Sequence, residues 1–258
     1  MTKTKENTNN VVSIEDKLPV EMSIMEQDAH AGLEGITQED LATPRLKILM
    51  QLSPELEENK EARAGMIMNT VTSDLYDGEK GIVVVPVAYN RQYVEWSDRG
   101  QSSGAPVNVY DADSDILSKT TRDQGNKDRL DNGNYVDVNA NHFILYFDKE
   151  GNPQPALVTM KSTQLKKSRR WNSMMLNLKI QGSKGPFTPP SYSHKYKLKI
   201  VKEKNDLGTW YGWDVERVGP VESKSVYEMA KSFAGSIKSG EVKAKPDQDA
   251  QKSNVPFE

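Results

Sequence analysis

Runs of β-branched residues and alternation of apolar with polar positions predict β-strands along most of the chain. The run GIVVVPVAY at 81–89 predicts a buried strand in which Pro86 marks an edge or a bulge. Residues 192–202 alternate strictly. One face of this second strand carries Tyr192, His194, Tyr196, Leu198 and Ile200, and the other carries Lys195, Lys197 and Lys199. Further strands or short buried elements are predicted at 46–52, 91–96, 141–147, 156–160 and 210–218.

A helix is predicted at 162–179, where apolar residues recur at helical spacing. Ser162 or Thr163 is the expected N-cap, and Gly182 is expected to close the C-terminus. The apolar face is formed by Leu165, Trp171, Met175 and Leu178. The first half of this helix also concentrates basic residues.

The predicted fold is mainly β with some α-structure. About six strands, one internal helix and a C-terminal helix at 225–238 that ends at Gly240 favour an OB-like antiparallel barrel or sandwich. A connection as long as 97–134 is usually functional or disordered. The predicted domains are a flexible acidic N-terminal arm (1–38), an OB-like nucleic-acid-binding domain (39–240) and a flexible C-terminal tail (241–258).

Composition limits the covalent cross-links and metal sites that the protein can have and indicates its cellular location. The chain has 258 residues and no cysteine, which excludes disulfides and thiolate–metal sites. The first residues have no apolar core of the kind found in secretory signals, and no apolar run approaches the roughly 20 residues needed to cross a bilayer. We therefore expect a protein of the cytoplasm.

Charge is distributed unevenly along the chain, although the net charge is only −3. Residues 1–60 contain 6 Lys and Arg against 12 Asp and Glu. Residues 155–205 contain 12 Lys and Arg against a single acid, Glu203. Because ordinary surfaces intersperse the two signs, this second region predicts binding of a polyanion.

The predicted DNA-binding residues combine cations with aromatic rings. Lysine and arginine neutralise phosphates, and rings stack on bases of any sequence. Trp171 and one of Trp210 or Trp213 are the expected stacking residues, whereas Tyr192 and Tyr196 are expected in the core. The full predicted set is Lys161, Lys166, Lys167, Arg169, Arg170, Trp171, Lys184, Lys195, Lys197, Lys199, Trp210 and Trp213. The alternative is a solvated helix face beside an edge strand that its lysines protect from aggregation.

Catalytic patterns are missing from the sequence. His30, His142 and His194 lie in a polar arm or in alternating strands, and no hydrolase, zinc-protease or phosphate-loop motif occurs. The DADSD run at 111–115 resembles the start of a calcium loop, but the sixth position is Ile116. We therefore predict a protein that is not an enzyme and uses no cofactor or metal, with a metal-dependent nuclease as a remote alternative.

Three segments resemble a group of tailed-bacteriophage single-stranded DNA-binding proteins of the replication module. They are LATPRLKILMQLSPEL, ARAGMIMNTVTSDLYDGEKGIVVVPVAYNRQYVEW and WYGWDVERVGPV, and the resemblance spans about Leu41 to Gly240. It implies an OB-type core and binding of single-stranded DNA without sequence preference during phage replication and recombination. A virion component or an inhibitor of a host factor, whose basic patch binds an acidic protein, is the main alternative.

The C-terminal end loosely resembles the tails with which many single-strand binders recruit replication proteins. Val255, Pro256 and Phe257 are the predicted partner-binding residues, and acidic residues precede them. The predicted partners are single-stranded DNA and, through this tail, phage or host replication and recombination proteins. A homo-oligomer is possible, and no membrane partner is expected.

Overall fold

The computed structural model describes residues 22–37, 40, 42–98, 104–205 and 208–246, and the chain divides into two units. In the first unit, Met1–Leu41, the short helix α1 (Met22–Gln27) leaves its apolar side chains exposed. All further elements belong to the second unit, Ala42–Glu258, which is described below by itself.

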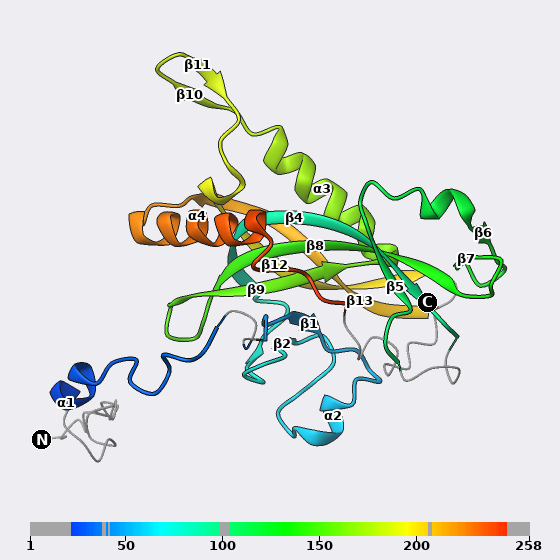
Figure 1. The fold of residues 1–258 in the computed structure, drawn as a ribbon, viewed down its shortest axis with the longest axis horizontal. Coiled ribbons are helices and arrows are strands. Elements are labelled where there is room, and N and C mark those ends of the chain that lie inside the picture. Colours follow the sequence, from blue (N-terminus) through cyan, green and yellow to red (C-terminus); the bar gives the residue numbers. More distant parts are fainter. Residues whose placement is uncertain (1–21, 38–39, 41, 99–103, 206–207, 247–258) are drawn as a thin grey trace, which may run out of the picture. The chain divides into compact units, whose positions relative to one another are not determined.

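A curled antiparallel sheet of eight strands forms the centre of the second unit (Figure 1). Its main path runs β13-β12-β4-β8-β7-β6, while β5 pairs with β4 and β9 pairs with β8. The strands are β4 (Ile82–Trp96), β5 (Asn108–Asp111), β6 (Thr121–Arg122), β7 (Asp128–Arg129), β8 (Tyr135–Phe147), β9 (Pro153–Met160), β12 (His194–Asn205) and β13 (Gly208–Pro220). The sheet is an open half-barrel, which confirms the predicted mainly β, OB-like class.

The remaining elements are short, apart from two helices. Two small sheets accompany the main one: β1 (Leu46–Ile48), β2 (Ile67–Asn69) and β3 (Leu75–Tyr76), and the hairpin of β10 (Ile180–Gly182) and β11 (Gly185–Phe187). The α-helices are α2 (Glu55–Glu58), α3 (Leu165–Leu176) and α4 (Lys224–Ser239). Single 3₁₀ turns occur at η3 (Ile116–Lys119), η4 (Ser162–Gln164) and η5 (Ser191–Ser193).

The bulge predicted from Pro86 lies inside β4. The register with β8 shifts between Pro86 and Ala88, so that Val87 is the extra residue. The extra residue interrupts the inward and outward alternation, since the consecutive residues Val87 and Ala88 both pack with Val85 in the same core cluster. The predicted strands at 81–89 and 91–96 are therefore one continuous strand.

Each face of the main sheet has its own core. On one face, Trp171 and Met175 of α3 pack with Ile144 of β8 and Leu198 of β12. On the other face, Val226 and Ala230 of α4 pack with residues of β4, β8 and β9. Helix α3 and helix α4 consequently cover opposite sides of the sheet (Figure 1).

Helix α4 begins and ends where its sequence predicts. The Ser223 side chain accepts a hydrogen bond from the Val226 amide, and Gly240 adopts the left-handed conformation with φ of 85°. Helix α3 differs from the prediction, because it ends at Leu176 and its N-terminal residue Gln164 makes no side-chain cap. Gly182 does not end this helix but belongs to the following hairpin.

The predicted boundary of the C-terminal tail at 241 is wrong for the residues described. Val242 and Ala244 are buried and pack in the same core cluster as α4. The ordered body therefore continues beyond Gly240, because these side chains cover apolar surface on the sheet. Residues 247–258 lie outside the described part of the chain.

Candidate nucleic-acid interface

Carboxylates in or next to β12 and β13 pair with four of the seven cations predicted on α3 and β12. Lys167 Nζ lies 3.2 Å from Glu203 Oε1, and Arg170 Nη1 lies 3.1 Å from Asp214 Oδ1. Lys199 and Lys195 pair with Glu216 and Glu222 at 2.7 and 3.8 Å. The expectation of a surface nearly free of counter-charge is wrong at these four residues. Acids that follow the basic region in sequence return beside it, because the β12–β13 pairing places Asp214 opposite Lys199.

Four other predicted cations lie apart from acids. Lys166, Arg169, Lys184 and Lys197 form no ion pair with any carboxylate in the described ranges. Lys166, Arg169 and Lys184 are exposed, and Lys197 is half-buried. Lys161 is half-buried at the end of β9. The predicted set thus separates into paired and unpaired cations rather than forming one continuous patch.

Two of the three tryptophans predicted as stacking candidates belong to the core. Trp171 is fully buried, with its ring 4.4 Å from that of His142 and nearly parallel to it. Trp213 is also buried, opposite Ile200 in the β12–β13 register. The prediction of base stacking by Trp171 is therefore wrong, because the helical period turns this ring towards the apolar face. Trp210 is half-buried, and its indole nitrogen donates a hydrogen bond to Glu203.

A pocket of about 190 Å³ opens between α3, the middle of β4 and β8, and the η3 turn. Its lining combines aromatic, basic and aliphatic side chains and includes no acidic residue. The lining residues are Tyr89, Arg91, Tyr93, Leu117, Val138, Ala140, Leu165, Ser168 and Arg169. Arg169 is the only member of the predicted DNA-binding set among them.

Strand alternation places a tyrosine, an arginine and a second tyrosine on the pocket side of β4. Tyr89 is 38% exposed, whereas Tyr93 is buried. The Arg91 guanidinium donates hydrogen bonds to the hydroxyls of Tyr89 and Tyr93. Both contacts raise the pKa of Arg91, the one with Tyr89 more strongly. Arg91 is exposed and forms no ion pair with a described carboxylate. The Y-x-R-x-Y spacing at 89–93 is the signal of this arrangement in the sequence, although alternation by itself predicts only a strand.

Beneath this pocket, a buried histidine connects the sheet to α3. His142 Nε2 lies 2.8 Å from the hydroxyl of Ser168, and its ring lies 5.1 Å from that of Tyr89. Burial lowers the pKa of His142 to about 3, so the ring is neutral at physiological pH. His142 holds Ser168 and Trp171 in place under the pocket.

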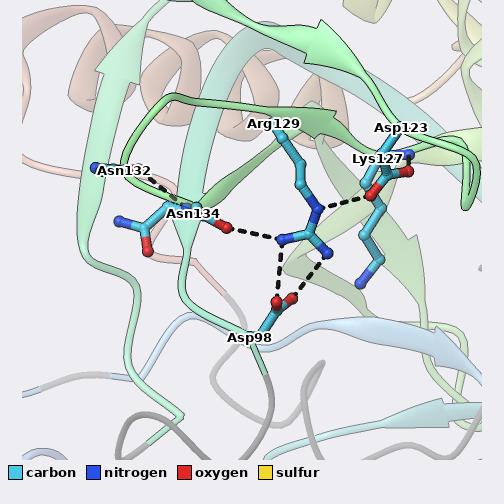
Figure 2. A network of polar contacts seen from close by, with 7 residues as sticks. Asp98, Asp123, Lys127, Arg129, Asn132 and Asn134 are labelled. Atoms are coloured by element: carbon cyan, nitrogen blue, oxygen red, sulfur yellow. Dashed lines mark hydrogen bonds and ion pairs between the residues drawn. The ribbon is translucent and has the colours of Figure 1, made fainter.

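Beyond the end of β4, a dense polar network joins described residues of the connection predicted at 97–134. Figure 2 shows Arg129 held by Asp98, at 3.0 and 3.1 Å, and by Asp123 at 2.6 Å. Arg129 also donates to the backbone carbonyl of Gly133. The described part of this connection therefore contains short strands and the η3 turn, which forms one wall of the pocket.

Next to this network lies the buried carboxylate of Glu95. Four side chains donate hydrogen bonds to it: Asn108, Tyr110, Asn132 and Asn134. Burial alone would raise the pKa of Glu95, but these hydrogen bonds outweigh it and hold the pKa at about 2. All four donors belong to the connection between β4 and β8. Their hydrogen bonds to Glu95 therefore hold this connection against the end of β4.

The acidic run at 111–115 forms no metal centre in the part of the chain that the structure describes. Asp115 pairs with Lys119 in the same turn, at 3.1 Å. Across the described residues, no group of three or more His, Asp or Glu side chains is placed to hold a metal ion. In those same ranges, none of the helices has the length and apolar character needed to span a bilayer. The predicted tail residues Val255, Pro256 and Phe257 lie outside the described residues.

Among the comparisons with known proteins, the one with protein-family models gives a match. A protein-family model described as "Pam3 phage gp34-like protein" matches residues 9–243. No curated protein and no solved structure matches the chain. The match covers nearly the whole described region and confirms the phage part of the resemblance noted in the sequence.

Proposed function

Because this chain belongs to the Pam3 phage gp34-like protein family, we propose that it is a phage protein that binds single-stranded DNA. The observation that carries the proposal is the acid-free pocket lined by Tyr89, Arg91 and Arg169. In this proposal the protein binds without strong sequence preference during phage replication and recombination. It acts by holding the strand and not by catalysis.

The chemistry of the pocket suits one unit of a nucleic-acid strand. Arg91 and Arg169 are exposed cations on two different elements, β4 and α3, and can neutralise successive phosphates. Tyr89 offers an exposed ring, and stacking of a base on such a ring contributes roughly 1–3 kcal/mol whatever the base. The combination of backbone neutralisation with stacking is typical of single-strand binding surfaces.

The size of the pocket also favours a strand over a free metabolite. Pockets for drug-sized ligands commonly enclose about 300–1,000 Å³. A volume of about 190 Å³ is smaller, so we expect one base or sugar-phosphate unit to enter while the rest of the strand crosses the surface. Lys166, one turn before Arg170 on α3, would meet a neighbouring phosphate.

The test is binding of a labelled oligothymidylate, followed by fluorescence anisotropy at several salt concentrations. We expect Arg91→Gln and Arg169→Gln each to weaken binding and to reduce the slope of log K against log salt by about 0.7, which is the value for one phosphate of a single strand. Tyr89→Leu should weaken binding about tenfold with an unchanged slope. Lys238→Gln removes a charge from α4, on the opposite side of the sheet, and should change neither quantity.

A structural or host-interaction role is the second candidate, favoured by the carboxylates that pair with Lys167 and Arg170. Absence of oligothymidylate binding at low salt would reject the DNA proposal and leave this candidate. Binding that the Arg91, Arg169 and Tyr89 variants do not weaken would show that the strand lies elsewhere. Magnesium-dependent loss of the oligonucleotide would instead indicate a nuclease.

A further inference from the structure

A projecting hairpin carries an exposed aromatic ring beyond the C-terminus of α3. Strands β10 and β11 pair only with each other, and Figure 1 shows them extending from the end of the helix. Phe187 of β11 is 47% exposed, and Leu176 at the end of α3 is 70% exposed. Such large apolar side chains on a small projecting element indicate a contact with another molecule.

The ring of Phe187 is supported from one side. A Cβ atom at Gly182 would come within 3.0 Å of the Phe187 ring, so the ring lies directly over the glycine backbone. Ile180 pairs with Phe187 across the hairpin. One ring face is therefore fixed against the hairpin while the side chain remains almost half exposed, a geometry that offers a flat surface for stacking.

The hairpin is also tied to the helix that borders the pocket. The Lys179 ammonium donates a hydrogen bond to the Thr188 hydroxyl, and that hydroxyl donates to the Leu176 carbonyl at 3.4 Å. These contacts join the base of the hairpin to the last turn of α3. Phe187 on the hairpin and the pocket residue Arg169 on α3 thus lie on two elements that these hydrogen bonds connect.

Charge determines which molecule fits this surface. Lys184 is exposed in the two-residue turn, and no acidic residue occurs between Glu150 and Glu203. A second copy of the chain meeting this hairpin in a two-fold contact would bring like charges together. A strand with phosphates and bases complements both the lysines and the ring.

We propose that the β10–β11 hairpin is a second contact for single-stranded DNA, with Phe187 stacking on a base and Lys184 neutralising a phosphate. This inference rests on the proposed function, because it extends the same ligand. Leu176 lies seven positions after Arg169 on α3, a rise of about 10 Å, and Phe187 lies beyond it, next to Thr188, whose hydroxyl bonds the Leu176 carbonyl. A strand that only fills the pocket would not reach Phe187, whereas one that continues along α3 would.

The experiment compares oligothymidylates of about 4 and about 16 nucleotides, the ends of the range of site sizes for one OB fold. We expect Phe187→Ala to weaken binding of the longer strand about tenfold and to leave the shorter strand unaffected. Phe187→Trp should retain the affinity, and Lys184→Gln should reduce the salt dependence for the longer strand only. Val71→Ala removes another exposed apolar side chain, 51% exposed in the β2–β3 turn, and should change neither affinity.

The outcomes separate this inference from the proposed function. Equal binding of the longer strand by the wild type, Phe187→Ala and Lys184→Gln, with weaker binding by Tyr89→Leu, would overturn the hairpin contact and retain the pocket. A change in the sedimentation coefficient of Phe187→Ala without DNA would assign the hairpin to contacts between copies, which also overturns it. Lys184→Gln keeps the ring and its glycine support intact, so its effect does not depend on the folding of the Phe187 variant.

Discussion

At the scale of single residues, burial decides the chemistry that a side chain can perform. His142 and Trp171 are types often found in binding sites, yet both are buried and stack on each other. Tyr89 and Arg91 are unremarkable in the sequence, yet they face the pocket. The difference follows from which face of β4, β8 or α3 each residue occupies.

The buried state of His142 predicts how stability depends on pH. The pKa falls from its ordinary value of 6.5 to about 3 because burial penalises the charged ring. A group whose pKa is lowered by folding stabilises the protein above pH 6.5 and loses this contribution as the pH falls towards 3. The free energy of unfolding should therefore fall by about 1.4 kcal/mol more in the wild type than in His142→Gln between pH values of about 7.5 and 5.5.

Urea unfolding of both proteins at each pH would measure this difference. The absolute stability of the variant also reflects loss of the ring contact with Trp171, so the comparison concerns only the change with pH. Parallel pH profiles would contradict the assignment of a neutral, buried His142.

At the scale of elements, the pairing of β12 with β13 controls how many cations remain available to a ligand. Asp214 of β13 forms an ion pair with Arg170 at 3.1 Å and lies 3.7 Å from Lys167. Both of these cations belong to α3. This carboxylate therefore couples the edge strand of the sheet to the helix beside the pocket. The same contact reduces the positive potential along α3.

Removing this charge should strengthen DNA binding. We expect Asp214→Asn to raise the affinity for oligothymidylate a few-fold and to steepen the salt dependence, because Arg170 becomes available to phosphates while Lys167 keeps only its pair with Glu203. The cost in stability should stay near or below about 1 kcal/mol, since the pairs are partly exposed. Glu228→Gln, which removes a carboxylate from α4 on the other side of the sheet, is the matched control in the anisotropy titration. An unchanged affinity of Asp214→Asn would place the strand away from this part of α3.

At the scale of the whole second unit, a segment close to the C-terminal end completes the core on the α4 side. Val242 and Ala244 are 6% and 7% exposed and share a cluster with Phe143 and Leu145 of β8, about 100 residues earlier in the chain. The core therefore depends on residues that the sequence assigned to a polar tail.

A chain that ends at Gly240 should be less stable than one that ends at Pro246. Loss of the two buried side chains predicts a decrease of about 2–4 kcal/mol in the free energy of unfolding. Urea denaturation of both chains would measure it, and the longer chain controls for the removal of residues 247–258. Equal stability would show that the segment contributes no apolar burial.

The sequence alone determined the local features of this protein. Alternation and β-branched residues identified the long strands, Pro86 marked the bulge in β4, and Ser223 and Gly240 delimit α4 as helix caps do. These features depend on backbone preferences and on neighbours within a few residues, so a single stretch of sequence contains the information. The concentration of cations at 155–205 was also visible without a structure.

Only the tertiary structure decided which of these residues can meet a ligand. It brought Asp214 and Glu216 beside the predicted cations, placed Trp171 in the core, and joined β4, β8, α3 and η3 around one pocket. Charge compensation and burial depend on residues that are distant in sequence and become neighbours only through strand pairing and helix packing. Linear counts of charge and aromatic residues therefore found the basic region but not the pocket that α3 forms with β4, β8 and η3.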